Sequence, residues 1–311
     1  MKRNPNFDIL RGILASWVVV IHALWLTGIH GGWVARSGQI AVDMFIVLSG
    51  YVISKSMLIK RPTYGAFISQ RFWRIFPAFA VCLAFALAIR PLTLHTSPTE
   101  FAREAAENHW FWPQLIAHLS LLFGLVPNVI MPEASGAFLP PAWSISLEMQ
   151  LYIVTPLLLW AIARFRWSAA AVLGAFSALA FFPPVTWRLA DYMSPLGAFL
   201  PQKIFFFLVG MGCCIANRVF WQYQDYDIAL LPLPGAVYLM RLGTWSYSLY
   251  LIHYPVLHLT RAMLPAMPAW TMVTMLLLIG GPISVGLAAL LHIYVELPGI
   301  QLGRKLSHLT K

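Results

Sequence analysis

Long apolar runs, separated by short polar segments, limit most strongly what this chain can form. They lie at 9–29, 40–59, 75–92, 113–130, 145–163, 168–186, 199–217, 228–240, 244–263 and 270–293. A spanning helix needs about 20 apolar residues, and an open sheet at membrane depth would leave its edge amides unpaired. The pattern therefore predicts an all-α protein, a polytopic bundle of about ten transmembrane helices. The run at 228–240 is short and contains Pro232 and Pro234, so a re-entrant segment fits it almost as well.

Composition leads to the same class of protein. Only 10% of the 311 residues are charged, whereas a soluble domain carries about 25%. The net charge of +10 could indicate nucleic-acid binding, but a cationic cytoplasmic face is ordinary in inner-membrane proteins. We therefore expect a multi-pass protein of the bacterial inner membrane, with the lipid bilayer and not nucleic acid as its surroundings. The first run contains Arg11 and His22, so we expect it to remain attached as the first helix.

The basic residues predict how the chain is oriented. If the N-terminus lies inside and the chain crosses ten times, about two thirds of the 21 Lys and Arg residues fall on the cytoplasmic side. This bias favours an arrangement with both termini inside. Arg164 and Arg166 fall on the outer side and argue against it locally. Loss of the weak span at 228–240 would move the C-terminus outside.

The first apolar run carries three ionisable residues on one stripe. On an ideal helix Arg11 lies about 20° and Asp8 about 40° from His22, so the three share one stripe. His22 is about 16 Å further along the axis than Arg11, beyond mid-membrane. An ionisable group at that depth is costly and faces a polar cavity or a partner. The plain alternative is that Arg11 extends to the inner interface and His22 bonds a neighbouring helix.

Two arginines follow in the next polar segment. Arg71 and Arg74 are three residues apart, so on a helix they point the same way. Paired guanidinium groups suit phosphate binding. Ordinary anchoring at a cationic inner face would explain them almost as well.

Two later helices carry polar stripes of their own. Ser144, Glu148 and Tyr152 recur every four residues, which places them on one face and suggests a polar pocket. Tyr250 and His253 continue a stripe that begins at Ser246, although hydrogen bonds between helices are at least as good an explanation there.

The sequence lacks the motifs of several other kinds of site. No histidine pair has metal-site spacing with a carboxylate, and no glycine-rich phosphate loop or nucleophile elbow occurs. The three cysteines, Cys82, Cys213 and Cys214, lie in apolar runs and are expected to be buried hydrophobes. We therefore expect no metal site.

Taken in order, these motifs resemble the acyltransferase-3 family of bacterial integral membrane acyltransferases over nearly the full chain. The matching segments are FDILRG at 7–12 with His22, VDMFIVLSGY at 42–51, RFWRIFP at 71–77, WSISLE at 143–148, SYSLYLIH at 246–253 and YVELP at 294–298. There are departures. Ile46 stands where the family often has Phe, and Leu297 where it often has a basic residue.

The resemblance implies about ten helices and O-acylation, often acetylation, with acyl-CoA as co-substrate and a polysaccharide or other carbohydrate hydroxyl as acceptor. It implies that Arg11 and His22 matter for activity, and that Arg71 and Arg74 matter for activity or donor binding. Many relatives carry a further extracytoplasmic domain. We expect a membrane-only member here, with a transmembrane domain at 5–299 and a short basic cytoplasmic tail at 300–311.

The resulting hypothesis is a membrane O-acyltransferase that works across the bilayer. Arg71 and Arg74 would bind the donor phosphates near the inner face. His22 would act as general base or carry the acyl group transiently, with Arg11 beside it and Glu148 or Asp43 as its orienting group. Asp8, Ser49, Ser144, Tyr152, Tyr250 and His253 would complete a polar pocket.

Two other classes remain open. A transporter or flippase that exports a glycan or acylated metabolite would also need ionisable residues in the membrane. It would show broken helices related by an internal repeat, and the sequence shows no repeat. A non-catalytic scaffold would leave the buried His and Arg unexplained. The acceptor, the acyl chain length and the oligomeric state cannot be inferred from the sequence.

Overall fold

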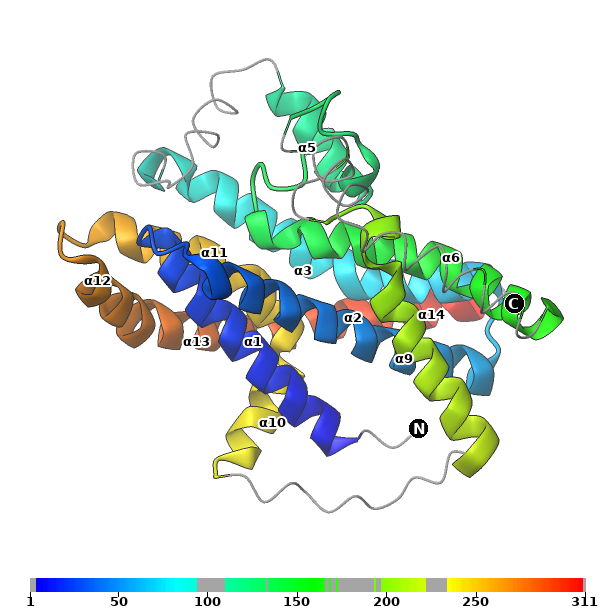
Figure 1. Ribbon diagram of the computed structural model, residues 1–311. Coiled ribbons are helices and arrows are strands. Elements are labelled where there is room, and N and C mark those ends of the chain that lie inside the picture. Colours follow the sequence, from blue (N-terminus) through cyan, green and yellow to red (C-terminus); the bar gives the residue numbers. More distant parts are fainter. Residues whose placement is uncertain are drawn as a thin grey trace.

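The computed structural model describes residues 4–93, 110–132, 134–165, 168, 172, 193, 197–221 and 234–309. Every regular element in these ranges is helical (Figure 1). The first nine in chain order are α1 (Pro5–Leu26), α2 (Gly32–Lys60), α3 (Tyr64–Thr93), α5 (Phe111–Leu119), η2 (Phe123–Leu125), η3 (Pro140–Ala142), α6 (Trp143–Phe165), α9 (Leu200–Trp221) and α10 (Ala236–Thr244). The rest are α11 (Ser246–Met263) and one continuous run made of α12 (Ala269–Met275), η4 (Leu276–Gly280), α13 (Gly281–Leu291), η5 (His292–Glu296) and α14 (Leu297–Leu309).

Six of the described helical segments are long and apolar enough to cross a membrane. They are Pro5–Leu26, Gly32–Lys60, Tyr64–Thr93, Pro140–Phe165, Leu200–Val219 and Ala269–Ser307. The prediction of an all-helical, multi-pass membrane protein is thereby confirmed. The predicted total of ten spanning helices is not confirmed.

The span predicted at 113–130 is wrong as one continuous helix. Helix α5 ends at Leu119, and Leu121 adopts a left-handed backbone conformation with φ of 60°. The chain then passes through η2, where Gly124 packs on the carbonyl oxygen of Ala198 so closely that a side chain would clash. Figure 1 shows α5 to one side of the main bundle, above α3 in this view, rather than running through it.

Two other predicted spans have different outcomes. The span at 168–186 lies almost entirely outside the described residues. Of the span at 228–240, the described part belongs to α10, which begins after Gly235 and is nine residues long. A nine-residue helix rises only about 14 Å. The described helix therefore fits the re-entrant alternative better than a full crossing.

Helix directions follow from contacts between distant residues. Asp43 pairs with Lys203 and Tyr51 with Asn217, so α2 and α9 run parallel. Tyr64 and Phe67 at the start of α3 contact Ile153 and Tyr152 in the middle of α6, in reverse order along the chain, so these two helices run antiparallel. Ten alternating spans would instead make the α2 and α9 segments antiparallel. That alternation is wrong because α5 does not cross.

Glycines permit the closest crossings in the bundle. A Cβ on Gly243 of α10 would lie 1.7 Å from the carbonyl oxygen of Asp8, and one on Gly12 would lie 2.1 Å from that of Leu239. Helices α2 and α9 meet in the same way at Gly50 and Gly210. Small residues that let backbones approach are the usual device of helix packing in membranes, where apolar burial gives little net drive.

The C-terminal helix closes the bundle against α3. Pro77 lacks the N–H that would bond the carbonyl of Trp73, and Gly299 of α14 packs on that carbonyl oxygen. Gln70 donates a hydrogen bond to Ser307 at 2.8 Å. Residues 300–309, predicted as a separate tail, therefore continue a packed helix. Because α14 is antiparallel to α3, the start of α1 and the end of α14 lie at the same end of the bundle.

Candidate active site

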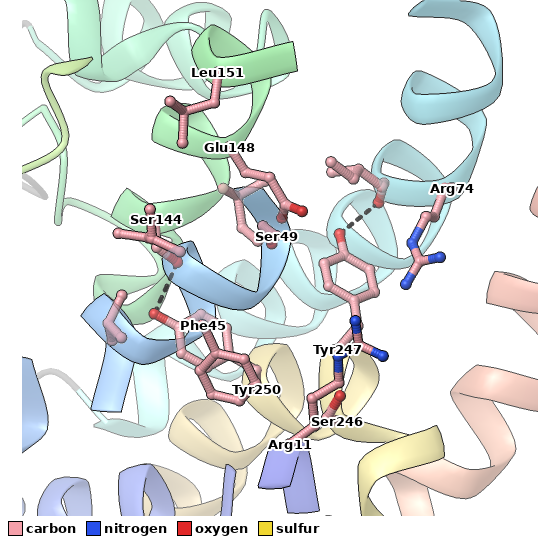
Figure 2. A pocket seen from close by; sticks show the side chains of 14 residues that line it. Arg11, Phe45, Ser49, Arg74, Ser144, Glu148, Leu151, Ser246, Tyr247 and Tyr250 are labelled. Carbon is pink, nitrogen blue, oxygen red and sulfur yellow. Dashed lines mark hydrogen bonds between the residues drawn. The ribbon is translucent and has the colours of Figure 1, made fainter. Parts of the chain in front are cut away.

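A cavity of about 110 Å³ lies where α1, α2, α3, α6 and α11 meet (Figure 2). Its apolar lining comes from α2, α3 and α6, and its polar groups come from every one of the five helices. The lining residues are Arg11, Val42, Phe45, Ile46, Ser49, Arg74, Ile75, Ser144, Ile145, Glu148, Leu151, Ser246, Tyr247 and Tyr250. Six predicted site residues therefore meet at this cavity: Arg11, Ser49, Arg74, Ser144, Glu148 and Tyr250.

Two cations and one carboxylate define the charge of the cavity. Arg11 and Arg74 extend their guanidinium groups toward its centre from different helices, and Glu148 faces them (Figure 2). Asp8 is 2% exposed and lies 3.4 Å from Arg11, one turn away on α1. The predicted stripe of α1 thus supplies the cavity with an arginine that is held by a buried carboxylate.

Arg71 is placed differently from Arg74, although the sequence grouped them. Its guanidinium group lies over the rings of Phe67 and Tyr152, 5.3 Å from each centroid. Arg71 does not line the described cavity, whereas Arg74 does and remains exposed within it. Only one of the two arginines is therefore positioned to contact a ligand in this cavity.

The polar stripe of α6 forms part of the wall. Tyr152 donates a short hydrogen bond to the Glu148 carboxylate one turn earlier. Ser144 donates to the hydroxyl of Tyr250 at 2.9 Å, and that hydroxyl donates to the carbonyl of Pro141 at 2.8 Å. The Tyr250 ring is thereby fixed at the boundary of the cavity, against Phe45 at 6.4 Å between centroids.

Beyond Tyr250 the stripe of α11 reaches α1. The Nε2 atom of His253 lies 3.0 Å from the Nδ1 atom of His22, and His253 is fully buried. The ring of Tyr250 lies 6.1 Å from that of His253. His22 is not among the described residues that line the cavity. The two histidines therefore form a second polar centre, next to the cavity and on the far side of Tyr250.

Asp43 lies outside both centres. Its carboxylate pairs with Lys203 of α9 at 2.7 Å, and both side chains are largely buried. This pair joins two parallel helices within the first half of each. No residue near Asp43 in sequence indicated Lys203 as its partner, 160 positions away.

A buried network behind the cavity was not predicted. Ser248 donates to the carboxylate of Glu296 at 2.8 Å, and the Nδ1 atom of His292 lies 2.8 Å from the same oxygen. His292 and Glu296 are the first and last residues of the π-helical segment η5. Such segments often occur at functional sites. The sequence signal for Glu296 was the YVELP segment at 294–298, which contains it.

Chemically, the arrangement can bind an anion and transfer a proton. Two guanidinium groups on one cavity favour phosphate or another oxyanion, and a neutral imidazole can take a proton from a hydroxyl. Within the described ranges, no three His, Cys, Asp or Glu side chains gather in a way that could hold a metal ion.

Comparison with known proteins agrees with this chemistry. A protein from Komagataeibacter xylinus, provisionally named a membrane-bound transacylase, is 28% identical over 195 residues, which cover 61% of this chain and 46% of that protein. A protein from Staphylococcus aureus (strain MSSA476), provisionally named an O-acetyltransferase, is 25% identical over 174 residues, which cover 51% of this chain and 25% of that protein. A protein of Rhizobium radiobacter named protein 2 in the picA locus is 28% identical over 163 residues, half of this chain and 74% of that protein.

The matches thus span less than half of the first two relatives. No solved structure gives a significant match. The acyltransferase domain model of the acyltransferase-3 family matches residues 4–240, which include α1, α2, α3 and α6 with their cavity-lining residues. This chain belongs to the acyltransferase-3 family.

Proposed function

We propose that this protein is a membrane O-acyltransferase that moves a short acyl group, acetyl, from cytosolic acyl-CoA to a hydroxyl of a sugar or polysaccharide. One observation carries the proposal: a cavity with two arginines lies inside the bundle, next to two histidines in contact, of which His253 is buried and His22 is half-buried. Family membership supports acyl transfer as the reaction. The relatives named for O-acetyl transfer support acetyl as the group.

Arg74 and Arg11 are the proposed donor-binding residues. Guanidinium groups bind phosphate through paired, charge-assisted hydrogen bonds, and these two approach the cavity from different helices, α3 and α1. Arg71 would act indirectly, by fixing Tyr152 and through it Glu148.

The proposed chemical step uses His22. Its imidazole takes the proton of the acceptor hydroxyl while the oxygen attacks the thioester carbonyl carbon. The new C–O bond forms and the C–S bond breaks. The proton then passes from His22 to the thiolate, which leaves as free CoA thiol. In the alternative order His22 itself carries the acyl group, and a labelled acyl-protein would then accumulate when no acceptor is present.

The proposed topology places both termini in the cytosol of a bacterium, with the protein in the inner membrane. Because α6 runs antiparallel to α3, Arg164 lies at the same end as the start of α3. The described basic residues at that end include Lys55, Lys60, Arg61, Arg164, Arg218, Arg304 and Lys305, and those at the opposite end are Arg36, Arg90 and Arg261. This bias supports a cytoplasmic location for the first end. A total of ten spans would require that segments outside the described residues also cross the membrane.

An assay with purified protein in lipid vesicles tests the proposal. Wild-type protein with labelled acetyl-CoA should release CoA thiol and transfer label to a polysaccharide acceptor. His22→Gln, at the same protein level and melting temperature, should lose about 100-fold or more of this activity. Full activity of His22→Gln would exclude the mechanism. Passage of a glycan through the vesicle membrane without thioester cleavage would instead favour the transporter.

A further inference from the structure

The two histidines that meet between α1 and α11 come from positions 231 residues apart in the chain. Their ring centroids are 4.9 Å apart with an interplanar angle of 51°. Tyr254 packs edge-on against His22, with 5.4 Å between centroids. The His22 ring is therefore held from two sides by α11.

Backbone carbonyls determine where the protons of this pair lie. The Nδ1 atom of His22 is 3.0 Å from the carbonyl oxygen of Val18, and the Nδ1 atom of His253 is 2.9 Å from that of Leu249. A carbonyl oxygen only accepts hydrogen bonds, so each Nδ1 atom carries a hydrogen. A neutral imidazole has one N–H. The Nε2 atoms of both rings are therefore acceptors.

This assignment determines which ring donates the hydrogen bond between the two histidines. The Nδ1–H of His22 is shared between the Val18 carbonyl and the Nε2 lone pair of His253. The opposite direction, with His253 as donor, would leave two Nδ1 lone pairs facing carbonyl oxygens. The Nε2 atom of His22 keeps its lone pair, which is the form that a general base or nucleophile needs.

We propose that His253 is the positioning residue for His22: it holds the His22 ring with Nε2 unprotonated and accepts the Nδ1–H that carries positive charge during transfer. This inference rests on the proposed acyl transfer and deepens it. When Nε2 of His22 takes the acceptor's proton, the ring becomes a cation. The Nε2 atom of His253 then stabilises that cation through its hydrogen bond, and the cation later gives the proton to the departing thiolate.

The carboxylates expected to orient His22 are engaged elsewhere. Glu148 accepts the hydrogen bond of Tyr152, and Asp43 pairs with Lys203. In many enzymes a carboxylate orients the catalytic histidine through Nδ1. Here a neutral imidazole occupies that place. It can be fully buried at membrane depth without the cost of placing a carboxylate there.

Substitutions at position 253 separate orientation from packing. His253→Phe keeps a ring but removes the acceptor, so kcat should fall about 10- to 100-fold while the KM for acetyl-CoA changes little. His253→Gln puts an amide oxygen within reach of the His22 Nδ1–H and should recover at least a tenth of the wild-type kcat. His258→Phe, five residues later on the same helix, is the matched control and should keep wild-type kcat. Equal losses for His253→Phe and His253→Gln, or no loss for either, would overturn the proposal.

A spectroscopic measurement does not depend on how the variants fold. Solid-state NMR of wild-type protein with labelled histidine, in lipid, reports the tautomer of each ring. The His22 signals are identified as those missing in His22→Gln. They should show protonated Nδ1 and unprotonated Nε2; the reverse tautomer would refute the inference even if acyl transfer itself is confirmed. If instead wild-type protein is inactive or His22→Gln is fully active, the proposed function is what fails.

Discussion

Gly210 of α9 packs directly on the backbone of α2 at Val47: a Cβ at position 210 would lie 1.9 Å from the Val47 carbonyl oxygen. Two residues further along the same helix, Gly212 has open space at the corresponding position. The two glycines therefore differ in their surroundings although they share a helix and a residue type.

Gly210→Ala should destabilise the protein and Gly212→Ala should not. The clash at position 210 is with backbone, so α2 and α9 must separate, at a cost of about 1–3 kcal/mol or more. We expect a clearly lower melting temperature in detergent for Gly210→Ala and a temperature close to wild type for Gly212→Ala. Identical melting curves for the two variants would contradict the close approach of α2 and α9 at position 210.

Arg74→Gln should weaken donor binding more than Arg71→Gln. Arg74 lines the cavity, whereas Arg71 stacks on Tyr152. Loss of a charge-assisted hydrogen bond costs about 1.5–3 kcal/mol, so the KM for acetyl-CoA should rise about 10- to 100-fold for Arg74→Gln. For Arg71→Gln we expect mainly a lower kcat or stability. Steady-state kinetics measure both parameters. A KM that rises only for Arg71→Gln would make Arg71, and not Arg74, the donor-binding arginine.

Asp43→Asn should affect stability more than chemistry. Its partner Lys203 would keep a largely buried charge without a counter-ion, which costs up to about 3–5 kcal/mol. The exchanged pair, Asp43→Lys with Lys203→Asp, should regain part of the lost melting temperature and of the transfer rate. If the exchange restored stability and the rate stayed at zero, Asp43 would have the direct role at His22 that the sequence suggested.

The topology can be tested by labelling single cysteines. In a variant without Cys82, Cys213 and Cys214, a membrane-impermeant maleimide should label Met263→Cys from outside intact spheroplasts. It should label Arg164→Cys only after the membrane is opened. Labelling of both from one side would contradict the antiparallel arrangement of α3 and α6, or the end of the bundle that we place in the cytosol.

The sequence predicted the class of fold well and the path of the chain less well. Apolar runs locate helices because the bilayer allows few alternatives for the backbone. They do not show whether a run crosses. The run at 113–130 is apolar enough, yet the left-handed residue Leu121 ends its helix. That one error reversed the expected direction of α6 and placed Arg164 on the wrong side.

The site was predictable within single helices and not between them. Helical spacing correctly grouped Ser144 with Glu148, and Tyr250 with His253, because three or four residues make one turn. It also grouped Arg71 with Arg74, which the structure separates into an aromatic stack and a cavity wall. Pairs such as His22 with His253 and Asp43 with Lys203 depend on how helices pack, and no local pattern encodes that.

The two hydrogen bonds that fix Tyr250 also bear on the leakage of protons across the membrane. A passage wide enough for an acyl arm would also admit water and, with it, protons. The Tyr250 ring lines the cavity, lies 6.1 Å from the ring of His253, and is tied to Ser144 and Pro141. If acyl transfer reaches across the bilayer as we propose, a ring tied at this place would limit that leak, and the proton gradient would be kept between turnovers.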